Sequence, residues 1–484
     1  MKRLFSILMM LVLCFAFPAQ AQEADAVQIV LSDSGVTVNG APASADPREA
    51  VYVAHDIVFY LAGQDFTYGE GTKADAHTQE EADAHAVLHI TRPGTYVLSG
   101  KWSAGQVAVE IEDGKKDPDA VVTLVLNGVD ITCTVAPAVI FYNVYECSSD
   151  DEDDATMDVD LSNAGANVVI ADGTVNNLTG SYVARIYEPG TVELSEDGTE
   201  VKEAKKLHKY DGTLYSRRSM NIYGGEEGTG MLNIMAENEG LCSDLHLAIH
   251  GGSINISSGN DGINASEDSV SVAILNGGNV TVNVHGSTGE GDGVDSNGWL
   301  ILNGGSLTSA AYGQSMDAGI DSDNGIHLNG AALCATGNMF DHIAGGSAPY
   351  AVFSFASRQT GGMAYTLKNE AGETVAQWTP ANDFTYLVVS GEGVTPGTYT
   401  LWQGETQLAY TGTEVFGFGG GRPPVGPPPE GFKEAEGFDP ANRPERPEGF
   451  MPHGNRQPEA GEKRTDFVIT ESGSTFSGVA ATGK

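Results

Sequence analysis

Hydrophobic and polar positions alternate on both sides of a glycine corner that recurs through residues 211–337. The corner reads YGG, HGG, NGG, NGG and NGA, beginning at Tyr223, His250, Asn276, Asn303 and Asn329. The steps between corners are 27, 26, 27 and 26 residues, and so regular a period is typical of a solenoid.

The apolar columns around the corner predict the kind of solenoid. Apolar side chains lie three and one residues before the corner, as Leu300 and Leu302 do, and again four residues after it, as Leu307 does. This alternation predicts strand, turn, strand, whereas a helical repeat would space its apolar residues by three and four. The pattern therefore predicts an all-β chain folded as a parallel β-helix, with about three strands per coil.

A third short strand is expected about nine residues before each corner. Its inward residues are Leu214, Leu241, Val294 and Ile320, with Ile263 displaced by a four-residue insertion. The strand carries the sequences GNDGINA (259–265), GDGVDSN (291–297) and DAGIDSDN (317–324). Acidic residues therefore recur in register along this strand.

These acids suggest a cation site. Consecutive coils stack about 4.8 Å apart, and calcium lies about 2.3–2.6 Å from its oxygen ligands, so an ion between coils could reach both. We expect Ca²⁺ along Asp261, Asp292, Asp295 and Asp321, with Asn264, Asp317 and Asp323 as further ligands. The alternative is that Asp and Asn simply suit glycine-rich turns.

The remaining chain divides into five segments around this core. Residues 1–21 have the charged start, apolar stretch and small-residue cleavage site of a secretory signal peptide. Short alternating runs at 22–84 predict an N-terminal β segment, and the β-helix is expected over 85–345. A small antiparallel β module follows at 346–416 and caps the open end. Residues 417–464 are rich in Gly and Pro and should be flexible, while 465–484 form a tail with one more strand.

The charge balance limits the classes of partner that the chain can bind. The formal net charge is −40, from 25 basic and 65 acidic residues, which excludes nucleic acid as a partner and favours cations. With the signal peptide and no other apolar run long enough for a bilayer, we expect a secreted or cell-surface monomer that does not span a membrane. Of the cysteines, Cys133 and Cys147 are close enough in sequence for a disulfide, whereas Cys242 and Cys334 lie too many coils apart.

The ordered motifs GTYVLSG, LVLNGVDIT, VVIADGTVNNLTG, GGSINISSGNDGINA and GDGVDSNGWLILNGG support a family assignment. Over residues 85–412 the chain resembles the secreted carbohydrate-binding β-helix proteins first grouped as a domain of unknown function in clostridia and gut bacteria. The resemblance implies a right-handed parallel β-helix of pectate-lyase-like fold that binds calcium, and a partner of the cellulose or polyuronate type. Ala318 departs from the family's acidic pattern and puts the last site in doubt.

Three other functions stay open. A calcium-dependent polysaccharide lyase needs a base beside the cation, yet residues 210–367 contain no lysine, and Arg217–Arg218 is one adjacent pair. A hydrolase of the polygalacturonase type would need free carboxylates near a basic partner. A structural surface protein or adhesin would use calcium only for folding.

Sugar contact calls for exposed aromatic rings, because a flat apolar ring matches a pyranose face. The alternation places Trp299 outward, with His246 in the same column two coils earlier and Tyr312 in a turn. We therefore expect these three residues to contact the polysaccharide.

Overall fold

The computed structural model describes residues 26–391, 393–415 and 462–482. The expected signal peptide and nearly all of the Gly/Pro-rich segment lie outside these ranges. Within them, helix is limited to α1 (Gln79–Asp83) and two 3-10 turns, so the all-β prediction is confirmed. In the same ranges, no helix has the length and apolar character needed to cross a membrane.

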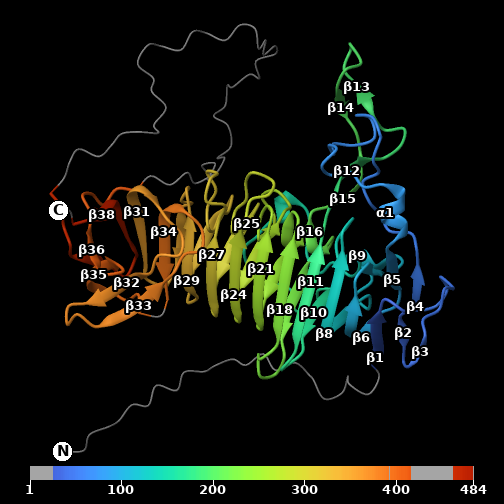
Figure 1. The fold of residues 1–484 in the computed structure, drawn as a ribbon, viewed down its shortest axis with the longest axis horizontal. Coiled ribbons are helices and arrows are strands. Elements are labelled where there is room, and N and C mark those ends of the chain that lie inside the picture. The colour runs from blue at the N-terminus through green and yellow to red at the C-terminus, as the bar shows by residue number, and fades with distance from the viewer. Residues whose placement is uncertain (1–25, 392, 416–461, 483–484) are drawn as a thin grey trace, which may run out of the picture.

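The body of the molecule consists of three rows of parallel strands, each row built from successive repeats (Figure 1). Row one comprises the first half of β8 (Val122–Cys133), β10 (Ala166–Ile170), β17 (Met220–Gly224), β20 (Leu247–Ile249), β23 (Val272–Leu275), β26 (Trp299–Leu302), β28 (Gly325–Leu328) and β30 (Ile343–Gly346). Row two comprises the second half of β8, β11 (Val175–Gly180), β18 (Met231–Ala236), β21 (Ser253–Ser258), β24 (Asn279–Val284), β27 (Ser306–Ala310) and β29 (Ala332–Gly337). Row three comprises β5 (Ala86–Ile90), β7 (Gly105–Glu110), β9 (Val139–Asn143), β16 (Gly212–Ser216), β19 (Glu239–Ser243), β22 (Ile263–Ala265) and β25 (Val294–Ser296), and β4 (Val51–Ala54) joins its edge in antiparallel fashion.

The strand register follows the predicted columns. In row one Leu300 lies opposite Ala273 on one side and Ile326 on the other. In row three Ile263 lies opposite both Leu241 and Val294, so the four extra residues of that repeat fall in the turn after β22. Rows one and two begin with β1 (Val27–Ser32) and β6 (Gly94–Trp102), which pair in parallel ahead of β8.

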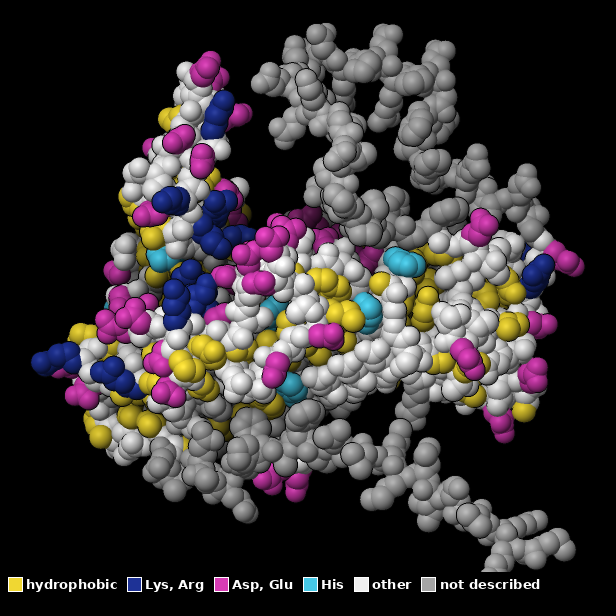
Figure 2. Space-filling view, turned by 180° about the vertical axis from the view of Figure 1, so that it is seen from behind, with side chains coloured by type: hydrophobic (Ala, Val, Ile, Leu, Met, Phe, Trp, Pro, Cys, Tyr) yellow, Lys and Arg dark blue, Asp and Glu magenta, His cyan; other side chains and the backbone are white. Residues whose placement is uncertain are grey.

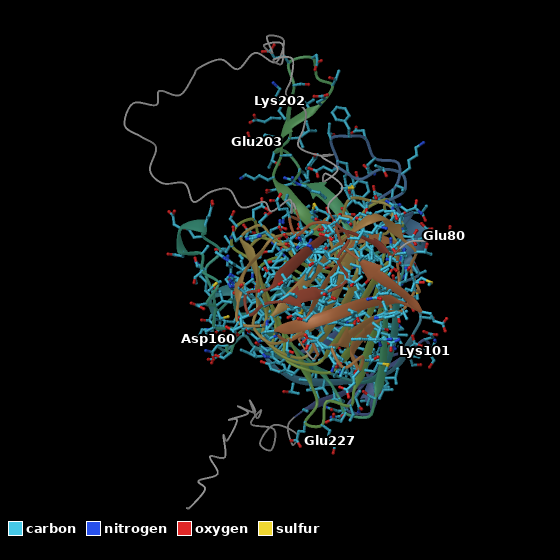
Figure 3. All side chains as sticks on the ribbon, turned by 90° about the vertical axis from the view of Figure 1, so that its left-hand side faces the viewer. Glu80, Lys101, Asp160, Lys202, Glu203 and Glu227 are labelled. Atoms are coloured by element: carbon cyan, nitrogen blue, oxygen red, sulfur yellow. The ribbon has the colours of Figure 1, made fainter. Side chains whose placement is uncertain are left out.

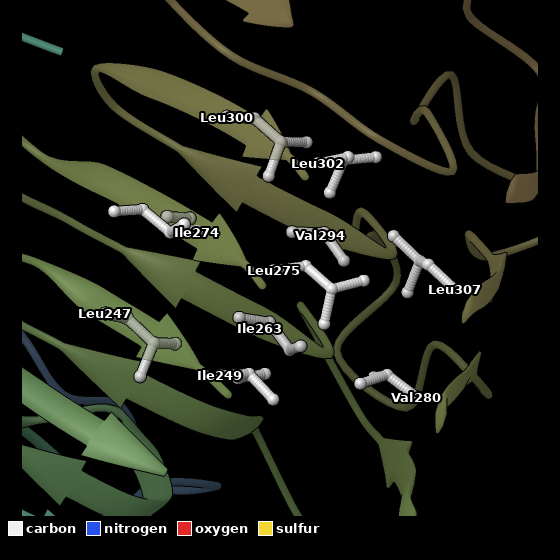
Figure 4. A pocket seen from close by; sticks show the side chains of 11 residues that line it. Leu247, Ile249, Ile263, Ile274, Leu275, Val280, Val294, Leu300, Leu302 and Leu307 are labelled. Carbon is white, nitrogen blue, oxygen red and sulfur yellow. The ribbon is translucent and has the colours of Figure 1, made fainter. Parts of the chain in front are cut away.

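Aliphatic side chains from the three rows meet in the interior (Figure 4). Leu247, Ile263, Val280 and Leu302 are among those lining the gap that remains, which holds about 20 Å³. A space of that size accommodates about one water molecule. This part of the interior is therefore a packed core and not a ligand site.

The corners between rows one and two are tied together along the stack. Asn303 donates a side-chain hydrogen bond to Asn276 at 2.8 Å and accepts one from Asn329 at 2.8 Å. Gly278 has φ +88, and a Cβ there would lie 2.7 Å from the carbonyl oxygen of Gly252. Only glycine fits a corner with this backbone conformation and this close approach between neighbouring repeats.

The C-terminal module covers the end of row two. Its strand β34 (Phe384–Ser390) pairs in antiparallel fashion with β29, and β31 (Tyr350–Gln359) pairs with β34. The other strands are β32 (Tyr365–Asn369), β33 (Thr374–Trp378), β35 (Gly397–Gln403), β36 (Thr406–Ala409), β37 (Phe467–Ile469) and β38 (Ser474–Ala481). A separate aromatic core with Phe353, Phe467 and Phe476 holds the module together.

An arm, residues 183–210, leaves the body between β11 and β16 (Figure 1). It is a hairpin in which β12 (Val183–Tyr187) pairs with β15 (Lys206–Tyr210), and β13 (Glu193–Leu194) pairs with β14 (Val201–Glu203). Seen along the stack, Lys202 and Glu203 near its tip stand clear of the body (Figure 3).

The disulfide that the spacing of Cys133 and Cys147 would permit does not form. Cys133 is fully buried at the end of β8, while the Cys147 thiol faces the carbonyl oxygen of Asp160 at 3.6 Å. Cys242 and Cys334 are also free thiols, as expected from their separation along the repeats.

Candidate functional site

Acidic side chains of successive repeats gather along row three. Glu239, Asp261 and Asp292 each stand two residues before an inward aliphatic residue, and parallel backbone bonds bring them into neighbouring coils. These three side chains form a first file, that is, a line of side chains along the stack. A second file begins with Asn264 opposite Asp295. We define the acidic column as Glu239, Asp261, Asn264, Asp292, Asp295, Asp317, Asp321 and Asp323.

Backbone amides of adjacent coils hold the first file of carboxylates. The amide of Asp292 donates to Oδ1 of Asp261 at 2.7 Å, and the amide of Ala318 donates to Oδ1 of Asp292 at 2.5 Å. Asp317 accepts a bond at its Oδ2 from the amide of Gly291 at 2.6 Å. At Ala318, where the earlier coils have an acid, the backbone thus contributes a hydrogen-bond donor instead.

The second file continues past the last strand of row three. The amide of Asp321 donates to the carbonyl of Val294 at 2.8 Å, and that of Asp323 donates to Ser296 at 3.1 Å. These bonds place Asp321 and Asp323 one coil beyond Asp295, although residues 317–324 form turns and not a strand. The structure therefore keeps the predicted ligand residues in neighbouring coils.

Burial and mutual repulsion make ionisation of the column costly. Burial, and then the charges of Asp261 and Asp321, raises the pKa of Asp295 to about 8. Burial is also the main reason that the pKa rises to about 7 at Asp261 and to about 6 at Asp321. Burial followed by the charge of Asp261 raises the pKa of Asp292 well above its usual value. Among the described residues, no Lys or Arg forms an ion pair with these acids.

Two acids of this region escaped the sequence analysis. Glu239 is 6% exposed, and its pKa is raised well above the usual value by burial and then by Asp211 and Asp261. Its position two residues before Leu241 matches that of Asp261 and Asp292 in the later repeats and could have identified it from the sequence. Asp341 is also buried, and burial followed by Asp321 raises its pKa to about 7. Asp341 follows the last repeat, so no column could have pointed to it.

The donor set suits a hard cation. Calcium takes carboxylate, amide and carbonyl oxygens. Among the buried oxygens without a hydrogen-bond partner in the described part of the chain are Glu239 Oε2 and Asn264 Oδ1 of the column and Oδ2 of the nearby Asp341. In the same part of the chain, no three His, Cys, Asp or Glu side chains already converge as a metal site. Binding would thus require side chains of the column to reorient or backbone carbonyls to contribute.

His246 is wrong as a sugar contact. It does share a column with Trp299, because Val272 of the intervening coil pairs with Trp299. However, only 1% of His246 is exposed, its Nδ1 accepts a bond from the amide of Val272 at 3.0 Å, and its Nε2 lies 3.1 Å from Ser148 Oγ. An acid-rich insertion, residues 148–160, covers this outward face, and Leu161 directly after it packs against Ala248.

Trp299 and Tyr312 do not form a joint platform. Trp299 is half-buried at the start of β26, and Tyr312 follows β27 in a different turn. Tyr312 packs partly against the core, and its ring lies over Gly286, where a Cβ would be 2.2 Å away. Their contact with a sugar stays a prediction.

The family model described as "Carbohydrate-binding domain-containing protein" matches residues 84–159 and 150–345, which together are more than half of the chain. The chain belongs to this family. The matched region contains the acidic column up to Asp323 and the arm.

One relative of the family member is a "Carbohydrate-binding domain-containing protein" of Acetivibrio thermocellus. The two are 29% identical over 170 residues, which is 35% of this chain and 44% of the relative, so the match spans less than half of the relative's length. A solved structure, the gadolinium derivative of a polysaccharide lyase-like protein from C. thermocellum, aligns with a TM-score of 0.38 and 21% identity over 66% of this chain and 92% of that one. This second likeness is too distant to support an inference.

Proposed function

We propose that the protein is an extracellular, calcium-dependent polysaccharide-binding protein for plant cell-wall or acidic glycans. We also propose that its three rows of strands wind as a right-handed parallel β-helix. Family membership supports carbohydrate as the class of ligand. The pairing of each repeat with the next supports the winding, and the signal-like sequence at residues 1–21 supports export.

The observation that carries the calcium proposal is the acidic column. Buried like charges without a cationic partner destabilise a fold, and the pKa values of Asp261, Asp295 and Asp321 are raised by that cost. A divalent cation would remove the repulsion. The residues proposed to hold Ca²⁺ are Asp261, Asn264, Asp292, Asp295, Asp317, Asp321 and Asp323, with Glu239 added by its position.

A bound cation would also supply a positive site for the carboxylates of an acidic glycan. The chain otherwise repels such a glycan, because its formal net charge is −40. The column's own contribution is to hold carboxylate and amide oxygens in consecutive coils through the backbone bonds from Asp292 and Ala318.

A lyase is less well supported than a binding protein. Lys209 lies near the start of the column, with its Nζ 2.9 Å from Oδ2 of Asp211. Although burial alone would lower it, the charge of Asp211 raises the pKa of Lys209 above its usual value. A lysine held in its protonated form is a poor base for removing a proton beside a uronate carboxyl.

The test is a pull-down of the mature protein on cellulose and on insoluble polygalacturonate, in calcium and in chelator. We expect retention on polygalacturonate that requires calcium, with the glycan intact afterwards. Release of unsaturated oligosaccharides would instead identify a lyase. If neither glycan retains the protein and the chelator only lowers the melting temperature, the column serves the fold and the protein has a structural role.

A further inference from the structure

A second hollow lies between the arm and the N-terminal segment 57–68. It has a volume of about 700 Å³, within the roughly 300–1,000 Å³ typical of ligand sites. One wall comes from residues 57–68, which precede the region matched by the family model, and the other from residues 186–208. The hollow therefore lies between two segments that contribute no strand to the three rows.

Contacts between the two segments fix this groove. The amide of Glu70 donates to the carbonyl of Arg185 at 2.9 Å, and the amide of Tyr187 donates to Tyr68 at 2.9 Å. Arg185 forms an ion pair with Glu70 at 3.1 Å, and its guanidinium lies 5.7 Å from the centre of the Tyr187 ring. These contacts hold the two walls of the groove in a fixed relative position.

Aromatic and aliphatic side chains line the groove and stay accessible. Phe59, Tyr68 and Tyr187 contribute half-buried rings, while Leu194 and Leu207 are 43% and 42% exposed. Because these side chains line one hollow, they form a contiguous apolar patch, and such patches mark ligand-binding grooves more often than scattered single side chains do. Rings with polar edges also match the alternating apolar faces and hydroxyl edges of a pyranose.

The polar members of the lining are nearly uncharged. Gln64 and Thr67 offer an amide and a hydroxyl. Burial, and then the charge of Arg217, lowers the pKa of His208, so this imidazole is neutral at pH 7. Asp65 is the one carboxylate among the lining residues, and bonds from Thr67 lower its pKa. Such a lining hydrogen-bonds to hydroxyl groups and offers no positive charge to a uronate.

The surroundings of the groove are also less acidic than the rest of the molecule. The arm holds five basic and six acidic residues, a net charge of −1 over 28 residues, whereas the whole chain averages about −2 over the same length. Figure 2 shows Lys and Arg side chains gathered along the arm and its root. This surrounding charge does not select between a neutral and an acidic glycan, whereas the lining of the groove, which contains no Lys or Arg, favours the neutral one.

We propose that the groove between residues 57–68 and the arm is a second glycan site, which binds a neutral hexopyranose chain by ring stacking without a metal ion. The inference rests on the carbohydrate-binding part of the proposed function and not on its calcium. The two sites would divide the ligands, since the acidic column takes an acidic glycan and the groove takes a neutral one.

The experiment is calorimetric titration of the full mature chain with cellohexaose and with hexagalacturonate, each in calcium and in EDTA. We expect cellohexaose to bind equally well in both buffers. Tyr187→Ala should weaken it at least tenfold, and Tyr187→Phe, which keeps the ring and loses only the 3.3 Å bond to Glu70, by less than threefold. Leu207→Asp should also weaken binding tenfold, because its exposed side chain lines the groove. The matched control is Met235→Asp, 60% exposed on β18, which should leave binding unchanged.

The outcomes separate the two proposals. If neither glycan binds the wild-type chain, the carbohydrate function itself fails. If only hexagalacturonate binds, or if Leu207→Asp and Tyr187→Ala bind cellohexaose as the wild type does while keeping its melting temperature, the groove is not a glycan site. Binding of a peptide that copies residues 422–452, lost in Tyr187→Ala and without any cellohexaose binding, would assign the groove to a proline-rich ligand and overturn the inference.

Discussion

The side-chain amide of Asn264 donates a hydrogen bond to Oε1 of Glu239 at 3.1 Å, across two neighbouring coils. The remaining side-chain oxygens of the pair, Glu239 Oε2 and Asn264 Oδ1, are buried without a partner among the described residues. Each unpartnered buried oxygen costs about 1–3 kcal/mol, so a cation that binds both oxygens would stabilise the pair.

Replacing Glu239 by Gln should separate folding from metal binding. In EDTA we expect Glu239→Gln to stabilise the protein by about 1 kcal/mol or more, because it removes a buried carboxyl whose ionisation burial and Asp261 oppose. With calcium, the variant should gain less stability than the wild type. Urea unfolding in both buffers measures this, with exposed Glu226→Gln as the control. Equal calcium effects in Glu239→Gln and wild type would remove Glu239 from the site.

Calcium itself should stabilise the wild-type chain in a concentration-dependent way. At a free concentration 100 times the Kd, a ligand bound only by the folded state adds about 2.7 kcal/mol. Asp295→Asn should abolish most of that gain, since the pKa of Asp295, about 8, shows how strongly the column opposes a charge there without a cation. Thermal melts over a calcium series test this. A gain that persists in Asp295→Asn would place the ion elsewhere.

The repeat and its acids were largely readable from the sequence. The corners at Asn276 and Asn303 fixed the register because a solenoid repeats the same contacts in every coil, and Leu300 pairs as that register requires. The same logic located Asp261, Asp292 and Asp295. It would also have found Glu239, had the column been followed one coil further toward the N-terminus.

Contacts made by non-repeating segments could not be read in this way. Nothing in the composition of the acid-rich insertion shows that it folds over β20 and buries His246 beside Ser148. Likewise, the contact of Tyr68 with Tyr187 joins segments more than a hundred residues apart, with no shared period. Each depends on long-range packing, which leaves no pattern in the local sequence.

Burial of His246 predicts a loss of stability in acid. Burial lowers its folded-state pKa from 6.5 to about 4, so between these values the unfolded chain binds a proton that the folded chain does not. Neutral, buried His246 therefore contributes up to about 3 kcal/mol to the free energy of unfolding. This contribution is complete above pH 6.5 and is lost as the pH falls to 4. We expect the unfolding free energy of the wild type to fall more steeply over this range than that of His246→Gln. Parallel slopes in urea titrations at pH 7 and 4.5 would show that His246 does not carry the effect.

A corner glycine, Gly278, and a glycine of the loop after β24, Gly289, predict a graded pair of substitutions. Gly278→Ala puts a methyl group at φ +88 and within 2.7 Å of the Gly252 oxygen, whereas Gly289→Ala, at φ +102, meets nothing within 4 Å. Both variants carry the backbone strain of about 1–2 kcal/mol, and only the first adds a clash, worth about 1–3 kcal/mol more. Chemical unfolding of both variants measures the difference. Equal losses of unfolding free energy in the two variants would show that the neighbouring corner moves aside for the methyl group without an energetic cost.

The stacked register also makes this molecule extensible. Each repeat pairs only with the one before and the one after it, as Leu275 does with Ile249 and Leu302. Duplicating residues 276–302 in frame would therefore lengthen the body by one coil and add a second copy of Asp292 and Asp295, with no compensating change elsewhere. The length of the acidic column could thus be set by gene duplication alone, one coil at a time.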